Sequence, residues 1–106
     1  SRNSPDSTAK EKAANGEANL AAEKRRSSAE KRKEQAPLRR KIQAAERDMD
    51  KIRERLAKMD EKLADPDLYA KFPEKGVKLS KDRSDLADLL DKIEEKWLEM
   101  SEELEA

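Results

Sequence analysis

The residues best suited to bind a ligand are basic, and they crowd into one short stretch. Residues 24–41 hold nine cations against two acids, Glu30 and Glu34. Such a run can neutralise phosphates and release the counterions of a nucleic acid, which gives binding that depends steeply on salt and little on sequence. No aromatic residue interleaves the cations, so stacking on unpaired bases is not expected. A solvated linker is the alternative interpretation of such a run.

Other chemistry is largely excluded by composition. The chain has no cysteine and no histidine, which excludes thiol chemistry, imidazole catalysis and the usual zinc sites. Gly16 and Gly76 are its only glycines, so it has no glycine-rich phosphate loop. The carboxylates are abundant, but a narrow helical protein offers no pocket to raise their pKa by burial. We therefore predict no catalytic residue and no metal site, and this chain is not expected to be an enzyme.

Length and charge point to a slender, soluble structure. Of the 106 residues 47% are charged and 34% hydrophobic, too few apolar side chains for a broad core. No apolar run approaches the roughly 20 residues that span a bilayer, and the polar N-terminus is not a signal peptide, so the cytoplasm is expected. The net charge is zero, yet residues 1–63 carry a charge of +6 and residues 64–106 a charge of −6. The chain is therefore strongly polarised.

Two rows of apolar residues must position these charges. Their spacing alternates between four and three, the heptad pattern of a coiled-coil seam. The first row is Leu38, Ile42, Ala45, Met49, Ile52, Leu56, Met59 and Leu63, and the second is Leu79, Arg83, Leu86, Leu90, Ile93, Trp97, Met100 and Leu104. Each row predicts a helix, and each helix is the other's partner.

The segment between the rows, residues 65–73, contains Pro66 and Pro73 and should turn the chain. Two helices joined by a short loop run antiparallel. A register in which paired residue numbers sum to 142 places Trp97, the bulkiest seam residue, opposite Ala45, the smallest, as close packing requires. Arg83 lies in the seam and is expected to reach Asp60 or the acidic loop.

The same register predicts which charges face each other across the seam. Three flanking pairs are opposite in sign and one pair is alike. The opposite pairs are Lys41 with Glu103, Asp48 with Lys96, and Lys62 with Asp82, and the like pair is Glu46 with Glu94. Because exposed ion pairs are worth roughly 0.2–1 kcal/mol each, they would select the register while the seam supplies the stability.

These patterns predict an all-α protein, a two-helix antiparallel coiled-coil hairpin preceded by a disordered or partly helical basic tail. The expected flexible linker covers residues 1–35 and the hairpin residues 36–106. Within the hairpin we expect a helix at about 38–64, a tip loop at about 65–76 and a helix at about 77–105. The long stretch without a fold of its own before Pro37 leads us to expect a fragment of a larger protein.

Several motifs in residues 36–106 resemble one known domain. They are Ala36-Pro37-Leu38-Arg39-Arg40-Lys41-Ile42, Leu63-Ala64-Asp65-Pro66-Asp67-Leu68-Tyr69, Pro73-Glu74-Lys75 and Glu95-Lys96-Trp97-Leu98. Together they are similar to the C-terminal coiled-coil domain of the ABC-F ATPases, in the Uup-like branch. The resemblance covers about two thirds of the chain. The hairpin of this chain does not have a wholly basic surface, because its second helix is acidic.

The resemblance implies a C-terminal accessory domain of a soluble ATPase that acts on the translating ribosome. It further implies a domain that binds DNA or ribosomal RNA, with ATP and Mg²⁺ held by two cassettes outside this chain and no cofactor within it. The alternative is a protein-interaction or spacer rod that docks on its own ATPase modules or on ribosomal proteins. We expect a monomer that contacts nucleic acid, with the ribosome as a further partner, and no membrane.

The candidate nucleic-acid-binding residues are the cation run together with the basic residues that avoid the seam on the outer face of the first helix. They are Lys24, Arg25, Arg26, Lys31, Arg32, Lys33, Arg39, Arg40, Lys41, Arg47, Lys51 and Lys58.

Overall fold

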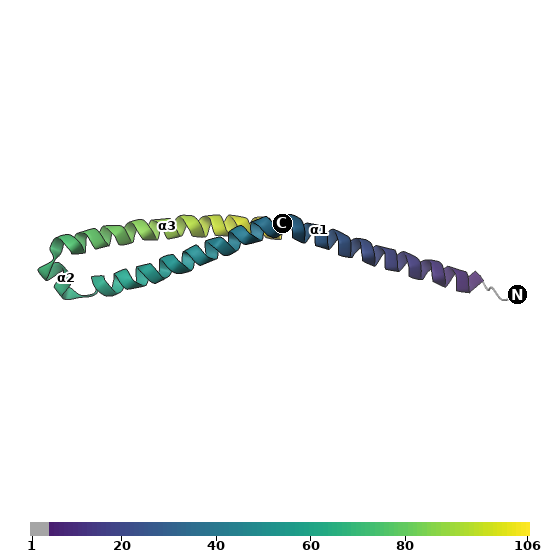
Figure 1. The fold of residues 1–106 in the computed structure, drawn as a ribbon, viewed down its shortest axis with the longest axis horizontal. Coiled ribbons are helices and arrows are strands. Elements are labelled where there is room, and N and C mark those ends of the chain that lie inside the picture. The colour runs from purple at the N-terminus through teal and green to yellow at the C-terminus, as the bar shows by residue number, and fades with distance from the viewer. Residues whose placement is uncertain (1–4) are drawn as a thin grey trace. The chain divides into compact units, whose positions relative to one another are not determined.

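The computed structural model describes the backbone of residues 5–106 and the side chains of residues 14–106. It contains three helices, α1 (Pro5–Leu63), α2 (Pro66–Lys71) and α3 (Pro73–Glu105), with no strand in the described part. Residues 37–63 of α1 and the whole of α3 lie side by side, and the short α2 joins them at the tip (Figure 1). The predicted all-α hairpin is therefore confirmed.

The chain divides into two compact units, Ser1–Ala36 and Pro37–Ala106. Each is described by itself below. The first four residues of the expected tail lie outside the described part of the chain.

The first unit is helical from Pro5, although the heptad pattern predicted a helix beginning only at about residue 38. Residues 17–36 contain no proline or glycine and are rich in alanine, glutamate, lysine and arginine, the strongest helix formers. Pro37 lies inside α1, where it removes one backbone hydrogen bond. From residue 14 to residue 34 every side chain except half-buried Ala22 is exposed. This unit therefore owes its helix to local propensity rather than to a packed face.

The second unit is built on the predicted seam. Ile42, Met49 and Ile52 are the buried hydrophobic residues, with 8%, 4% and 6% of their surface exposed. The other thirteen seam residues are half-buried, and this includes all eight of the row on α3. A helix pair covers only one side of each helix, so half-burial is the expected state of such residues. The core is a narrow line along the contact between α1 and α3.

The tip has more structure than the loop expected at residues 65–76. Asp65 caps α2 by accepting a hydrogen bond from the amide of Asp67 at 3.0 Å, and Pro66 opens the helix. α3 then begins at Pro73 instead of residue 77. Proline is favoured in the first helical turn because its φ angle is already helical and its missing N–H has no partner there. The two prolines that predicted a turn therefore also start the two helices.

Gly76 allows Tyr69 to lie directly on α3. It is the buried residue of that helix, and a Cβ atom placed on it would lie 2.7 Å from Cδ1 and 2.8 Å from Cε1 of the Tyr69 ring. The ring is held at its other end, where the hydroxyls of Tyr69 and Ser80 form a hydrogen bond of 2.5 Å. The tip is thus fixed by an aromatic side chain that packs where α3 has no side chain of its own.

Replacing Ile52 by alanine tests the seam. We expect Ile52→Ala to lower the free energy of unfolding by about 2–5 kcal/mol, because it removes buried methylene groups and leaves a cavity. Urea unfolding followed by the fluorescence of Trp97, the single tryptophan, reports on the hairpin alone. Lys51→Ala is the control, since Lys51 is the exposed neighbour of Ile52 and its loss should leave the midpoint nearly unchanged. Equal midpoints for the two variants would contradict the assigned core.

The two glycines provide a matched test of the tip. Gly76→Ala should cost about 1 kcal/mol net, because displacing the Tyr69 ring costs about 1–3 kcal/mol and exceeds the helix-propensity gain of about 1 kcal/mol. Gly16→Ala gains the same propensity with nothing within 4 Å of the new methyl group, so far-UV circular dichroism should show more helix. If Gly76→Ala raises the urea midpoint, the packing of Tyr69 on Gly76 is not a constraint on the tip.

Candidate nucleic-acid interface

All twelve candidate cations lie on α1, six in each unit. Eleven of them are exposed and Arg39 is half-buried. The structure does not gather the twelve on one surface, because a helix turns about 100° per residue and neighbours in sequence point in different directions.

In the first unit the cations form three pairs seven residues apart. The pairs are Lys24 with Lys31, Arg25 with Arg32, and Arg26 with Lys33. Residues seven apart share a helix face, whereas the three pairs point to three different sides. Arg32 also donates from Nε to the backbone oxygen of Ser28 at 3.5 Å. A partner lying along one side of this helix would therefore meet only part of the cation run.

In the second unit four cations share one face. Arg40, Arg47, Lys51 and Lys58 are spaced 7, 4 and 7, the same spacing as the seam but displaced to the opposite side of α1. We call this the outer face. All four side chains are exposed, and within residues 14–106 none of them forms an ion pair or a hydrogen bond. Their charges are therefore open to an external anion.

Acidic residues accompany the outer face and limit its potential. Glu54 lies between Lys51 and Lys58 on the same side of the helix, and Glu61 follows one turn beyond Lys58. Arg39 and Lys41 point to the two flanks rather than along the face. The structure thus groups four of the predicted residues and separates these two from them.

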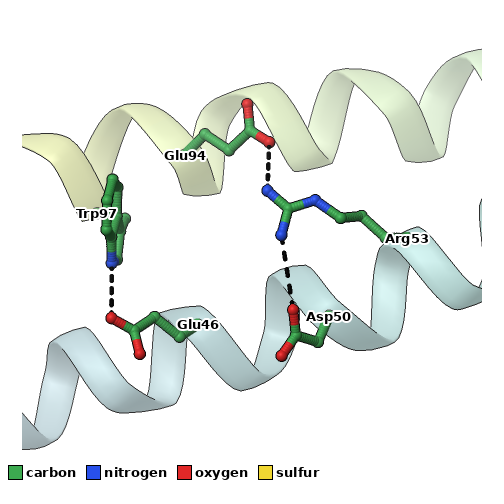
Figure 2. Close-up of polar contacts among 5 residues, drawn as sticks. All are labelled: Glu46, Asp50, Arg53, Glu94 and Trp97. Carbon is green, nitrogen blue, oxygen red and sulfur yellow. Dashed lines mark hydrogen bonds and ion pairs between the residues drawn. The ribbon is translucent and has the colours of Figure 1, made fainter.

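Two polar contacts across the seam, those of Arg53 and Trp97, were not among the predicted pairs (Figure 2). Arg53 of α1 reaches Glu94 of α3 at 3.0 Å and also lies 3.6 Å from Asp50. The indole Nε1 of Trp97 donates to Glu46 at 3.1 Å. The expected repulsion between Glu46 and Glu94 is thereby offset, because each carboxylate has its own partner.

The three predicted flanking ion pairs do not form within the described part of the chain. All six residues are without an ion pair among residues 14–106, because they lie on the outer edge of a two-helix contact, where ordering a long side chain costs about as much as an exposed pair contributes. Asp82 lies at the tip among lysines without pairing to any of them. The register did not predict the ion pair of Arg53, because the partner of Arg53 depends on the tilt of the side chains and not on which residues face each other.

The predicted contact between Arg83 and Asp60 is confirmed. Arg83 donates from Nε to one carboxylate oxygen of Asp60 and from a terminal nitrogen to the other oxygen at 3.1 Å. These hydrogen bonds lower the pKa of Asp60 below its usual value and raise the pKa of Arg83. Arg83 faces Met59 across the seam, and its guanidinium is hydrogen-bonded by Asp60, the next residue along α1. The charge of this half-buried arginine is therefore paired.

The Arg83–Asp60 pair predicts an acid-sensitive contribution to stability. Because the pKa of Asp60 is lower in the folded state than the value of about 3.9 in unfolded chains, the contribution is complete above pH 4 and is lost as the pH falls through the folded pKa. Asp60→Asn should lower the urea midpoint at pH 7, and its difference from the wild type should shrink as the pH falls below 4. Asp48→Asn is the control, since Asp48 is exposed and forms no ion pair among the described residues. A difference for Asp60→Asn that persists unchanged at pH 2 would contradict an ionic origin.

No metal-binding cluster of histidine, cysteine, aspartate or glutamate was found in the described residues. None of the helices there is long and apolar enough to cross a membrane.

Comparison with known proteins gives one match. The family model of the ABC transporter C-terminal domain matches residues 31–102, which cover the hairpin up to residue 102 and the cation run from Lys31 onward. Neither the curated proteins nor the solved structures gave a match. The matched segment is more than half of the chain and contains both seam rows apart from Leu104. The chain therefore belongs to the ABC transporter C-terminal domain family.

Proposed function

We propose that this domain is the accessory C-terminal element of a soluble, cytoplasmic ABC-F ATPase of the Uup-like branch. In this role it binds nucleic acid, either DNA or ribosomal RNA on the translating ribosome, through salt-dependent phosphate contacts. ATP and Mg²⁺ belong to the ATPase modules of such a protein, and the domain itself contributes binding rather than catalysis. Membership of the family supports an accessory role in an ABC protein.

The single observation that carries the nucleic-acid proposal is the outer face of α1. Its four cations are exposed and unpaired within residues 14–106, and their spacing puts them on the side away from α3. Cations that already have carboxylate partners would have to give those up to bind phosphate, whereas these do not. A row of free cations along a helix is the electrostatic footprint of a phosphate-binding surface.

The distribution of charge over the hairpin favours binding of a nucleic acid on one side. Residues 76–106 carry ten acids against five bases, so α3 repels a polyanion while the outer face of α1 attracts it. A nucleic acid would therefore lie along α1 on the side remote from α3. The same polarity favours contacts that position the domain without reading bases, since phosphate contacts carry no sequence information directly.

The test is a binding titration of the chain with a fluorescently labelled duplex DNA and with a structured RNA, each over a range of salt. Arg47→Gln, Lys51→Gln and Lys58→Gln together should reduce the slope of log K against log salt by about 3, one for each lost phosphate contact. The matched control is Lys81→Gln, Lys92→Gln and Lys96→Gln, which removes the same charge from exposed positions of α3. Circular dichroism of both variants checks that the helices remain.

The outcomes separate the two classes of function. A reduced slope for the α1 variant alone supports the proposal, and the tighter ligand identifies DNA or RNA as the partner. Equal losses for both variants would show that net charge rather than the outer face determines binding. If the wild type binds neither ligand at low salt, the proposal fails and a protein-docking or spacer role replaces it.

A further inference from the structure

The hairpin tip contains a pocket that the proposed function does not use. It has a volume of about 310 Å³ and is lined by side chains from both long helices and from α2. Lys62 comes from the end of α1, Lys75, Lys78 and Asp82 come from α3, and Leu68 and Leu79 supply apolar surface. The predicted register placed Lys62 near Asp82, but it did not place Lys75 and Lys78 beside them, because residues 65–76 were expected to form a loop.

The cations of this tip pocket are not neutralised by the protein. Lys62 and Lys78 form no ion pair within residues 14–106, and the predicted pairing of Lys62 with Asp82 is absent there. The Nζ of Lys75 lies 4.9 Å from the centre of the Phe72 ring, a contact that leaves its charge in place. The pocket therefore combines three cations with one carboxylate. Its net positive charge suits an anion.

The position of the tip pocket on α3 adds to this potential. Lys75 and Lys78 lie in the first two turns of a helix of 33 residues, which begins at Pro73. The N-terminal end of a helix carries a partial positive charge, so an anion near these lysines is favoured by the backbone as well as by the side chains.

Lys62 lies one turn beyond Lys58, on the flank of α1 between the outer face and α3. Added to the row of cations, it gives Arg40, Arg47, Lys51, Lys58 and Lys62, spaced 7, 4, 7 and 4. The row turns from the outer face towards the flank that faces α3, and its last member lines the tip pocket. From first to last it extends about 33 Å at a rise of about 1.5 Å per residue, close to one turn of a nucleic-acid duplex of about 34 Å.

We infer that the tip pocket binds a backbone phosphate of the nucleic acid whose other phosphates contact the outer face of α1. This inference rests on the proposed function, and it adds a site at the hairpin tip where the row of phosphate contacts ends. Lys62, Lys75 and Lys78 hold the phosphate oxygens, and contacts from two helices at once fix the direction of the strand along the hairpin. Asp82 opposes binding and limits the affinity of the pocket.

The experiment uses the same titrations with two further variants. Lys62→Gln, Lys75→Gln and Lys78→Gln together should weaken binding and reduce the salt slope by about 2 to 3, since up to three cations lose phosphate contacts. The triple variant of Lys81, Lys92 and Lys96 is again the matched control. Urea unfolding checks that losing the contact between Lys75 and Phe72 leaves the hairpin folded.

A substitution of opposite sign makes the test sharper. Asp82→Asn should tighten binding by about two- to fivefold, because it removes the carboxylate from the pocket. Asp88→Asn, an exposed position of α3 outside the pocket, changes the net charge equally and should have the smaller effect. Equal effects of the two substitutions would overturn the inference.

The outcomes distinguish this inference from the proposed function. Should the wild type bind while the Lys62, Lys75 and Lys78 variant matches its control in affinity and slope, the pocket inference is overturned and the proposed function stands. Failure of the wild type to bind removes both. Inorganic phosphate is the second probe. Its binding is monitored by NMR through the backbone amide signals of residues 62, 75 and 78. If it saturates these signals as tightly as the duplex does, the pocket takes a free phosphate and the assignment to a backbone phosphate is wrong.

Discussion

The apolar contact between α1 and α3 is the constraint on which the rest of the hairpin depends. Within residues 37–106 only Ile42, Met49 and Ile52 are buried hydrophobic residues, so the contact is a line rather than a broad core. Apolar burial contributes roughly 25 cal/mol per Å², and a narrow seam has little area to bury. Loss of the apolar contact at one layer therefore removes a large share of the stabilising free energy. The charged surfaces of α1 and α3 would then no longer be held in a fixed arrangement relative to each other.

Polar contacts at the edges of the seam then select one alignment. Trp97 bonds to Glu46, Arg53 bonds to Glu94, and Arg83 bonds to Asp60, so three layers are each fixed by a directional contact. None of these groups is deeply buried, and each pair is individually weak. Their value lies in register, because a slip by one heptad would part all three while leaving an apolar residue opposite another apolar residue at most layers. The packing of Tyr69 on Gly76 fixes the tip in a similar way.

The hairpin has an excess of basic residues on its first helix and an excess of acidic residues on its second. In residues 37–106 exposed cations without an ion pair line the outer face of α1 and the tip, while α3 becomes acidic towards its C-terminal end. An antiparallel hairpin places this acidic end beside the start of the seam on α1. The result is a surface that attracts a polyanion along one helix and repels it from the other, which favours one direction of approach even though the net charge of the chain is zero.

Much of the fold follows from the sequence alone. A spacing of four and three, interrupted by Pro66 and Pro73, permits little other than an antiparallel helical hairpin, and the placement of Arg83 against Asp60 follows from that register. The motifs from Ala36 to Trp97 were sufficient to indicate the domain of an ABC protein, which the family match confirms. The outer face could also be predicted, since helical periodicity alone places Arg40, Arg47, Lys51 and Lys58 away from the seam.

Tertiary structure decided the features that depend on side-chain direction and on local propensity. The tail before Pro37 was predicted to be disordered or only partly helical, because the heptad pattern reports packing and these residues have no packing partner to report. Arg53 pairs with Glu94, and Glu46 accepts a hydrogen bond from Trp97, because side chains lean along the helices. Residue spacing does not encode this lean. The tip pocket arises only when the chain reverses direction and brings Lys62 beside Lys75 and Lys78. Sequence by itself determined the seam, the turn and the outer face, since each is periodic or local, whereas the contacts of Arg53 and Glu46 and the lining of the tip pocket depend on side-chain direction and required the folded hairpin.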